Sequence, residues 1–299
     1  MRRLALAAVV VAVLAAAGCR SADGGDADLT VVATTTQVAD LVRNVGGSRA
    51  TVDGILRPNS DPHEYEPRPS DATALAKSDL VFRSGGDLDE WLDQVIDSAG
   101  GSAQQVTLID HVHRLGDDPH WWQNPRNAIL AVAAIRDALD KADPAGRAGF
   151  DRRAAAYTAR LRALDAAIQS CVGRVPRAKR KIVTTHDALG YFADRYGVDV
   201  IGAVIPSLST QGQASARDVD RLVKQIEDEG VEAIFPEAAV TQKLEQAVSR
   251  EAGARVGGKL YADALGPAGS GAATYLEAMR HNAEALVEGM SGGRVRCGL

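Results

Sequence analysis

Aromatic residues are scarce in this 299-residue chain, in which Phe, Trp and Tyr together make up 4%. Long runs of basic residues are absent as well, and 39 acidic residues outnumber 34 basic ones. Proteins that bind nucleic acids usually combine basic stretches with aromatic side chains on which bases stack. We therefore expect no nucleic-acid partner.

Long hydrophobic runs are also missing, with one exception at the start of the chain. Met1, Arg2 and Arg3 precede an unbroken stretch of apolar and small residues, 4–18, that stops at Cys19. This stretch is shorter than the roughly 20 residues that a transmembrane helix needs. A basic start followed by such a stretch is typical of an export signal. We predict that residues 1–18 are a signal peptide and that the mature chain is extracytoplasmic.

Cysteine is rare, and the first of the three cysteines directly follows this stretch. Residues 16–19, Ala-Ala-Gly-Cys, resemble the lipobox of bacterial lipoproteins, although leucine is usual where Ala16 stands. Lipidation of Cys19 would anchor the chain to the cell membrane, in the periplasm or at the cell surface, with residues 19–27 as a flexible spacer. Cleavage by an ordinary signal peptidase after 15–17, Ala-Ala-Ala, stays open as the alternative.

The other two cysteines, Cys171 and Cys297, form an even pair. In an oxidising compartment outside the cytoplasm such a pair is a candidate disulfide. Because sequence gives no distances, a disulfide and two free thiols both stay open.

From residue 28 onward, short β-branched segments alternate with longer helical patterns, although no sequence repeat is present. This alternation is typical of parallel α/β units. In the first half we expect a helix that begins at Asn124-Pro125, a helix at 70–77 capped by Ser70, and a helix at 88–96 ended by Gly100 and Gly101. The expected strands there are 29–34, 51–56, 80–82 and 105–109. We assign residues 28–143 to an N-terminal α/β lobe.

The middle of the chain has no strand pattern. Its apolar residues are spaced by threes and fours, which predicts one amphipathic helix of roughly 25 residues and about 38 Å within residues 144–175: Phe150, Ala154, Tyr157, Leu161, Leu164 and Ile168. A surface helix of one domain is the alternative. We favour a helix that joins two lobes, because the alternation of strands and helices resumes after it.

The second half repeats the architecture of the first. Residues 176–299 are assigned to a C-terminal α/β lobe, with strands at 181–185, 198–204, 233–235 and 255–261 and helices at 189–196, 216–229, 243–252 and 274–290. The predicted fold class is therefore α/β, with two lobes that each hold a mostly parallel sheet flanked by helices, joined by one long helix.

Histidine is also rare, and three of the six histidines follow predicted strands. His63 and His120 each lie in an Asp-Pro-His segment, where proline limits the entropy lost when the loop becomes ordered. His186 follows the strand at 181–185, and Asp263 follows the strand at 255–261. Because ligands of open α/β sheets bind beyond the carboxyl ends of strands, these four residues are candidates for one site.

Four segments now carry a family resemblance: 61–67, 118–125, 184–192 and 260–265. Their sequences, DPHEYEP, DPHWWQNP, TTHDALGYF and LYADAL, resemble in this order the zinc and manganese solute-binding lipoproteins of bacterial ABC importers. The resemblance implies that metal is held in the cleft between two lobes by His63, His120, His186 and Asp263, two residues from each lobe. It implies a monomer that delivers the metal to an ABC importer permease.

Three imidazoles and one carboxylate suit tetrahedral zinc, whereas manganese prefers more oxygen ligands. Members of the family that bind manganese tend to place a carboxylate where His186 stands, which favours Zn(II) over Mn(II) here. Carboxylates are expected to hold the outer ring nitrogens, and the candidates are Glu64, Asp187 and Glu237. Each of these acidic residues could equally be a solvated or capping residue.

The chain departs from the family in having Asn124 in place of an aspartate and in lacking a histidine-rich loop before His120. His111 and His113 could form a weak auxiliary metal site, or lie on one face of a strand for structural reasons. A zinc hydrolase is the main alternative function, because three histidines with an open position can activate water. If Asp263 fills that position the site is closed, so we expect no enzyme activity. A metal-binding surface adhesin is a second alternative.

Overall fold

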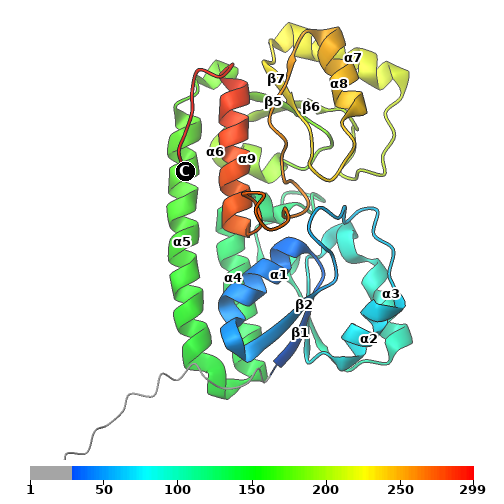
Figure 1. The fold of residues 1–299 in the computed structure, drawn as a ribbon, viewed down its shortest axis with the longest axis vertical. Helices are drawn as coiled ribbons and strands as arrows, with labels where there is room; N and C mark the ends of the chain where they lie inside the picture. The colour runs from blue at the N-terminus through cyan, green and yellow to red at the C-terminus, as the bar shows by residue number, and fades with distance from the viewer. Residues whose placement is uncertain (1–28) are drawn as a thin grey trace, which may run out of the picture.

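A computed structural model describes residues 29–299 of the chain (Figure 1). The predicted signal peptide, the lipidation site Cys19 and the spacer lie outside the described residues. Among residues 29–299, no helix combines the length and the apolar composition required to cross a bilayer.

The first half of the described chain forms a parallel sheet of four strands in the order β2-β1-β3-β4. These strands are β1 (Leu29–Ala33), β2 (Ala50–Gly54), β3 (Leu80–Arg83) and β4 (Gln104–Thr107). Helix α1 (Thr36–Gly46) connects β1 with β2, helix α2 (Pro69–Lys77) precedes β3, and helix α3 (Trp91–Ala99) precedes β4. We call this part the N lobe.

The second half repeats this order in a second parallel sheet, β6-β5-β7-β8. Its strands are β5 (Lys181–Thr184), β6 (Asp199–Ala203), β7 (Ala233–Phe235) and β8 (Arg255–Val256). The helices between the strands are α6 (Gly190–Tyr196), α7 (Ala216–Glu229) and α8 (Lys243–Ala252). We call this part the C lobe.

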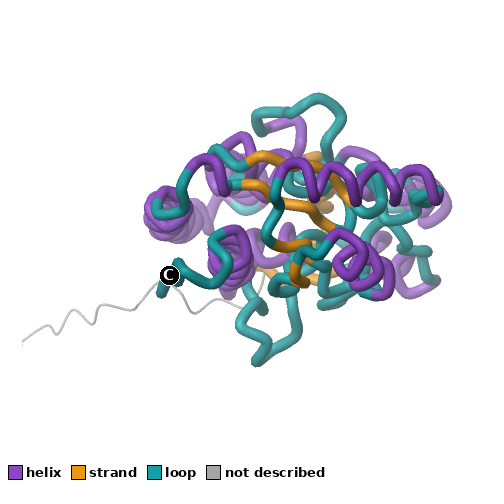
Figure 2. Tube along the Cα trace, turned by 90° about the horizontal axis from the view of Figure 1, so that it is seen from above, coloured by secondary structure: helices purple, strands orange, loops and turns teal. Residues whose placement is uncertain are grey.

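Three further helices lie along one side of both sheets: α4 (Pro125–Ala142), α5 (Arg147–Gly173) and α9 (Tyr275–Met290). Figure 1 shows α5 running along the full height of the molecule beside both lobes, and Figure 2 shows long helices end-on at the side of the strands. The predicted α/β fold with two parallel sheets and one long joining helix is confirmed.

The alternation of side chains along each strand explains how this layer forms. Val31 of β1 and Ile182 of β5 belong to a single apolar cluster that contains the inner faces of α4, α5 and α9. Their neighbours Val32 and Val183 point to the opposite faces, where α2 and α3 cover the first sheet and α7 and α8 the second. Both sheets are thus apolar on both faces, as buried parallel sheets are, and they share one core along the long helix.

Asp165 of α5 accepts hydrogen bonds from residues before and after the joining helix in the chain. Its carboxylate accepts hydrogen bonds from Arg195 of α6, at 2.7 and 2.8 Å, and from Arg126 of α4 at 3.2 Å. Tyr196 also donates to it, at 3.1 Å. Burial by itself raises the pKa of Asp165, but the hydrogen bonds from Arg195 and Arg126 outweigh burial and lower the pKa. The joining helix is therefore tied to each lobe by charged hydrogen bonds as well as by apolar packing.

Several expected elements differ in detail. The sequence pattern did not predict α1, because the threonines before it, 34–36, extend the β-branched pattern of β1. Helix α2 begins at Pro69, so Ser70 is not its N-cap; the carboxylate of Asp71 accepts from the backbone N–H of Arg68 at 2.7 Å. By contrast, the Asn124 side chain caps α4 as expected, accepting from the N–H of Arg126 at 2.9 Å.

Most expected strands are one or more residues shorter than predicted, and two of them show the reason. The strand at 255–261 is reduced to β8 and a single bridge at Leu260, because Gly257 and Gly258 interrupt it. A Cβ atom at Gly257 would lie 2.7 Å from the Phe235 ring, so only glycine lets the chain approach this closely. The strand at 105–109 ends at Thr107, and a 3-10 turn, Leu108–His111, buries Leu108 and Ile109.

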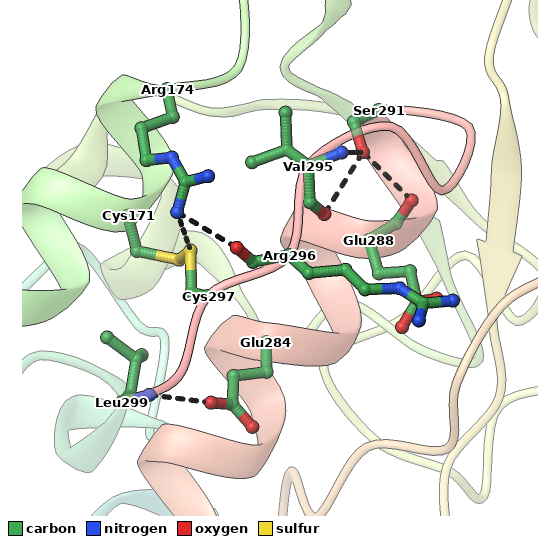
Figure 3. Close-up of a disulfide and its surroundings, with 9 residues drawn as sticks. All are labelled: Cys171, Arg174, Glu284, Glu288, Ser291, Val295, Arg296, Cys297 and Leu299. Atoms are coloured by element: carbon green, nitrogen blue, oxygen red, sulfur yellow. Dashed lines mark hydrogen bonds and ion pairs between the residues drawn. A yellow bond between two sulfur atoms is a disulfide. The ribbon is translucent and has the colours of Figure 1, made fainter.

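The C-terminal tail is bonded to α5 (Figure 3). Cys171 in the last turn of α5 and Cys297 form a disulfide, with Cα atoms 5.9 Å apart. Arg174 donates to the carbonyl of Arg296 at 2.9 Å, and the N–H of Leu299 donates to Glu284 of α9 at 2.7 Å. These contacts clamp the tail between α5 and α9.

We predict that Cys297→Ser lowers the free energy of unfolding by about 4 to 5 kcal/mol in the chain-entropy model, because the disulfide closes a loop of 126 residues. Urea denaturation at neutral pH measures this difference. Reduced parent protein is the control and should unfold like the variant. Equal stability of the variant and the oxidised parent would contradict the prediction.

We also predict that Asp165→Asn lowers the free energy of unfolding by about 2 kcal/mol at pH 7, because charged hydrogen bonds are lost. The pKa of Asp165 is lowered in the folded state, so its contribution is present at neutral pH and disappears as pH falls below about 4. Urea denaturation at pH 7 and pH 3 tests both parts. Asp194→Asn, at an exposed position of α6, is the control. A difference between parent and variant that stays constant with pH would refute the electrostatic origin.

Candidate metal centre

Four side chains that are far apart in the sequence meet between the two sheets: His63, His120, His186 and Asp263. Each offers one ligand atom, and these atoms all lie within 4.8 Å of one another. Within residues 29–299 this is the one such group of three or more histidine, cysteine, aspartate or glutamate residues. The side chains are at most 3% exposed.

The spacing of the ligand atoms matches a tetrahedral metal site. Asp263 Oδ2 lies 3.0 Å from His186 Nε2 and 3.2 Å from His63 Nε2, and Asp263 Oδ1 lies 3.4 Å from His120 Nε2. The Nε2 atoms of His120 and His186 are 3.4 Å apart. Ligands at 2.0 to 2.1 Å from a tetrahedral zinc ion are about 3.3 Å from each other. The group can therefore enclose one cation with little movement.

Three polar atoms at the centre, on Asp263 and His63, lack hydrogen bonds of good geometry among the described residues. Both carboxylate oxygens of Asp263 and Nε2 of His63 are buried and without a hydrogen-bond partner among the described residues. Buried polar atoms are normally hydrogen-bonded. These unpartnered atoms of Asp263 and His63 lie next to the Nε2 atoms of His120 and His186, an arrangement that fits a ligand set around an ion better than a hydrogen-bonded network.

His63 and His120 are positioned in the same way by their Asp-Pro-His segments. The backbone N–H of each histidine donates to the aspartate two residues earlier, Asp61 or Asp118, at 2.9 Å. This local bond stabilises the turn of each loop. The Asp-Pro-His segments thus present two imidazoles from the N lobe.

Asp118 has a second contact that the sequence analysis missed. Its Oδ1 also lies 2.7 Å from Nδ1 of His120, which leaves Nε2 directed at Asp263. A carboxylate on the outer nitrogen fixes the ring orientation and the tautomer of a metal-binding histidine. The repetition of the Asp-Pro-His segment could not have revealed it, because Asp61 in the other copy accepts from the backbone N–H of His63 and from Thr210.

His186 and Asp263 are positioned by one glutamate of the C lobe. Glu237 Oε2 lies 3.0 Å from Nδ1 of His186, an ion-pair distance without hydrogen-bond geometry, and Glu237 Oε1 accepts from the N–H of Asp263 at 3.2 Å. The glutamate is 3% exposed. Of the three acidic residues expected near the site, only Glu237 contacts a ring nitrogen of these histidines; Glu64 and Asp187 are exposed.

The N lobe also holds the backbone next to Asp263. Trp122 Nε1 and Gln123 Nε2 both donate to the carbonyl of Ala262 at 2.8 Å. These residues follow His120 directly in a short turn. The geometry of Asp263 therefore depends on both lobes.

A loop of the C lobe covers the His63 loop. Thr210 donates to Asp61 Oδ2 at 2.7 Å, and Gln211 donates to the backbone carbonyl of His63. Both hydrogen bonds cross between the lobes. They keep the His63 loop against the rest of the site.

The charges of the centre favour proton or cation binding. Burial raises the pKa of Asp263, but the neighbouring imidazoles of His186 and His120 outweigh burial, and the pKa lies well below its usual value. Burial lowers the pKa of His186, but Asp263 and Glu237 outweigh it and raise that pKa well above its usual value. Asp263 raises the pKa of His63 in the same way against burial.

The two other histidines considered as ligands lie elsewhere. His111 ends the 3-10 turn after β4 and His113 follows it, and both are exposed. The backbone of His113 exchanges hydrogen bonds with the Asn127 side chain. Neither histidine belongs to a group of three potential ligands among the described residues.

Comparison with known proteins places the chain among metal-binding proteins. The sequence profile of the family described as "Zinc-uptake complex component A periplasmic" matches residues 31–289. The manganese-binding lipoprotein MntA of Halalkalibacterium halodurans is 32% identical over 293 residues, which covers 95% of this chain and 97% of the relative. MntA of Bacillus subtilis is also 32% identical, over 97% of this chain and all of the relative.

A solved structure gives the same result. The periplasmic zinc-binding protein TroA of Treponema pallidum is 29% identical and superposes with a TM-score of 0.82, over 89% of this chain and all of TroA. The chain is thus similar along nearly its whole described length to proteins named for binding zinc or manganese.

Proposed function

Because this chain belongs to the family of the periplasmic component A of zinc-uptake complexes, we propose that it captures Zn(II) outside the cytoplasm and delivers it to the permease of an ABC importer. The chain is a substrate-binding protein of a metal ABC transporter and not an enzyme, as its relatives and its fold are of that kind. The metal ion is its cargo. The identity of the metal and the ligand set are the proposal.

One observation supports the ligand set above all others. His63, His120, His186 and Asp263 direct four ligand atoms at one buried centre, with spacings of 3.0 to 3.4 Å between neighbouring atoms. Four protein ligands fill a tetrahedral zinc site, which leaves no position for a reactive water. A closed site is suited to holding a metal and not to hydrolysis.

The donor set favours zinc over manganese. Three of the four ligand atoms are imidazole nitrogens, which suit zinc, whereas manganese is usually bound by more oxygen atoms. Manganese(II) is the alternative, because the two MntA relatives are named manganese-binding. Zinc, neutral imidazoles and one carboxylate carry a net charge of +1, which the nearby carboxylates of Asp118 and Glu237 can offset.

Delivery to a permease requires that the metal can leave a buried site. The two halves of the ligand set come from different lobes, so separation of the lobes would remove two ligands at once. The hydrogen bonds of Thr210 and Gln211 across the lobes would break in the same movement. We further propose that residues 1–18 direct export and that lipid on Cys19 holds the protein, as a monomer, at the membrane near its permease.

We predict that His63→Ala, His120→Ala and His186→Ala each weaken zinc binding at least about 100-fold, because each removes one of four ligands. Competition with a chromophoric chelator, on protein first stripped of metal, measures the affinity. The same titration with manganese decides between the two metals.

His111→Ala is the matched control, since this exposed histidine lies outside the group. It should bind zinc like the parent. If the three ligand variants also bound zinc like the parent, the proposed site would be wrong. If the parent bound manganese more tightly than zinc, the proposed metal would be wrong and the site would stand.

We predict that zinc affinity falls steeply with acidity, by about 100-fold or more between pH 7.5 and pH 5. Imidazoles bind metal only when neutral, so protons compete with zinc. Raised pKa values of His63 and His186 mean that this competition begins above the ordinary histidine pKa of about 6.5. Chelator competition at several pH values, corrected for the protonation of the chelator, measures the effect. Equal affinities at pH 5 and pH 7.5 would exclude histidine ligation.

A further inference from the structure

Two buried residues of the C lobe are connected to the site without belonging to it. Thr185 is 2% exposed and directly precedes His186, and Glu245 is 2% exposed in the first turn of α8. The Thr185 hydroxyl donates to Glu245 Oε1 at 2.6 Å. The same hydroxyl accepts from the backbone N–H of Glu237 at 2.9 Å. A chain of hydrogen bonds thus runs from α8 to Glu237.

Among the described residues Glu237 has three polar contacts, two to the candidate ligands His186 and Asp263 and one to Thr185. Its two carboxylate oxygens contact His186 and the N–H of Asp263, at 3.0 and 3.2 Å. Its backbone N–H is bound by Thr185. The Thr185 hydroxyl therefore holds the backbone of Glu237, and the Glu237 side chain in turn contacts the His186 ring and the backbone of Asp263.

The Glu245 carboxylate fixes the direction of that hydroxyl. A threonine hydroxyl has one proton and two acceptor lone pairs. Because the proton is given to a carboxylate, a lone pair is left for the N–H of Glu237. A charge-assisted hydrogen bond is also stronger than a neutral one, so the hydroxyl is held more firmly than a water or an amide would hold it.

A purely structural role does not account for Glu245. Burying a carboxylate costs several kcal/mol unless it is well paired, yet Glu245 Oε2 is buried and without a hydrogen-bond partner among the described residues. Its place in the first turn of α8 favours a negative charge through the helix dipole. The dipole does not explain why the side chain is directed at the residue next to a ligand.

We infer that Thr185 and Glu245 are positioning residues of the metal site, which hold Glu237, and through it His186 and Asp263, in the geometry of the bound ion. This inference rests on the proposed function. The negative charge of Glu245, one hydroxyl away from Glu237, also helps to offset the positive charge of a divalent cation at the centre.

Thr185→Val and Thr185→Ser test the hydrogen bond. Valine keeps the shape of threonine and removes the hydroxyl, whereas serine keeps the hydroxyl. We expect Thr185→Val to weaken zinc binding about 10- to 100-fold, as loss of outer contacts does at other metal sites, and Thr185→Ser to stay within about threefold of the parent. Co(II) as a spectroscopic probe should give a changed visible spectrum in Thr185→Val and the parental spectrum in Thr185→Ser.

Glu245→Leu tests the far end of the chain, with Glu251→Leu on the exposed side of the same helix as its control. We expect Glu245→Leu to weaken zinc binding and change the Co(II) spectrum as Thr185→Val does, and Glu251→Leu to behave like the parent. Urea denaturation of the metal-free variants shows whether each one folds.

Parental zinc affinity and a parental Co(II) spectrum in folded Thr185→Val or Glu245→Leu would overturn the inference. Equal losses in Thr185→Val and Thr185→Ser, with the Co(II) spectrum unchanged, would overturn it too, because packing alone would then explain the effect. Failure of the parent protein to bind either zinc or manganese would instead overturn the proposed function. The two failures are therefore distinguishable.

Discussion

The buried carboxylate of Asp263 is the constraint on which the arrangement of the molecule depends. It is 1% exposed and faces three imidazoles, none of which gives it a hydrogen bond of good geometry. Burying a carboxylate in such a place costs several kcal/mol unless it is well paired. A divalent cation bound by this carboxylate and three neutral imidazoles, as we propose, would offset this cost.

The fold joins the two lobes on one side through shared helices and places the candidate site between the lobes on the other. Helices α4, α5 and α9 share one apolar core with the inner faces of both sheets, so the lobes have a common wall. Across the site the lobes contact each other through polar groups, such as Trp122 with the carbonyl of Ala262 and Thr210 with Asp61. Apolar packing on one side and a few hydrogen bonds on the other suit a protein that must release what it binds.

Around the ligands lies a second set of carboxylates, one for each of two imidazoles. Asp118 holds His120 within the N lobe, and Glu237 holds His186 within the C lobe. Among the described residues, His63 has no such carboxylate on its outer ring nitrogen and is instead held through its backbone by Asp61 and Gln211. The candidate ligand with the least support on its ring thus lies in the loop that the C lobe covers.

Much of this protein is determined by short-range patterns in its sequence. Local side-chain preferences explain the alternation of strands and helices and the Asn124 cap of α4. They also explain the apolar residues of α5, which recur every three or four positions. These features could therefore be predicted from the sequence. The four candidate ligands could be found because each follows a strand and because their segments resemble a known family. Helix α1 was hidden by threonines that continue the β pattern, and the end of β8 by the contact of Gly257 with Phe235, which lies far away in sequence. The roles of Asp118, Glu237 and Glu245 could be decided only by the tertiary structure. Exposed and buried acidic residues cannot be told apart in a sequence. Only the folded structure decides which carboxylate contacts a ring nitrogen or a hydroxyl.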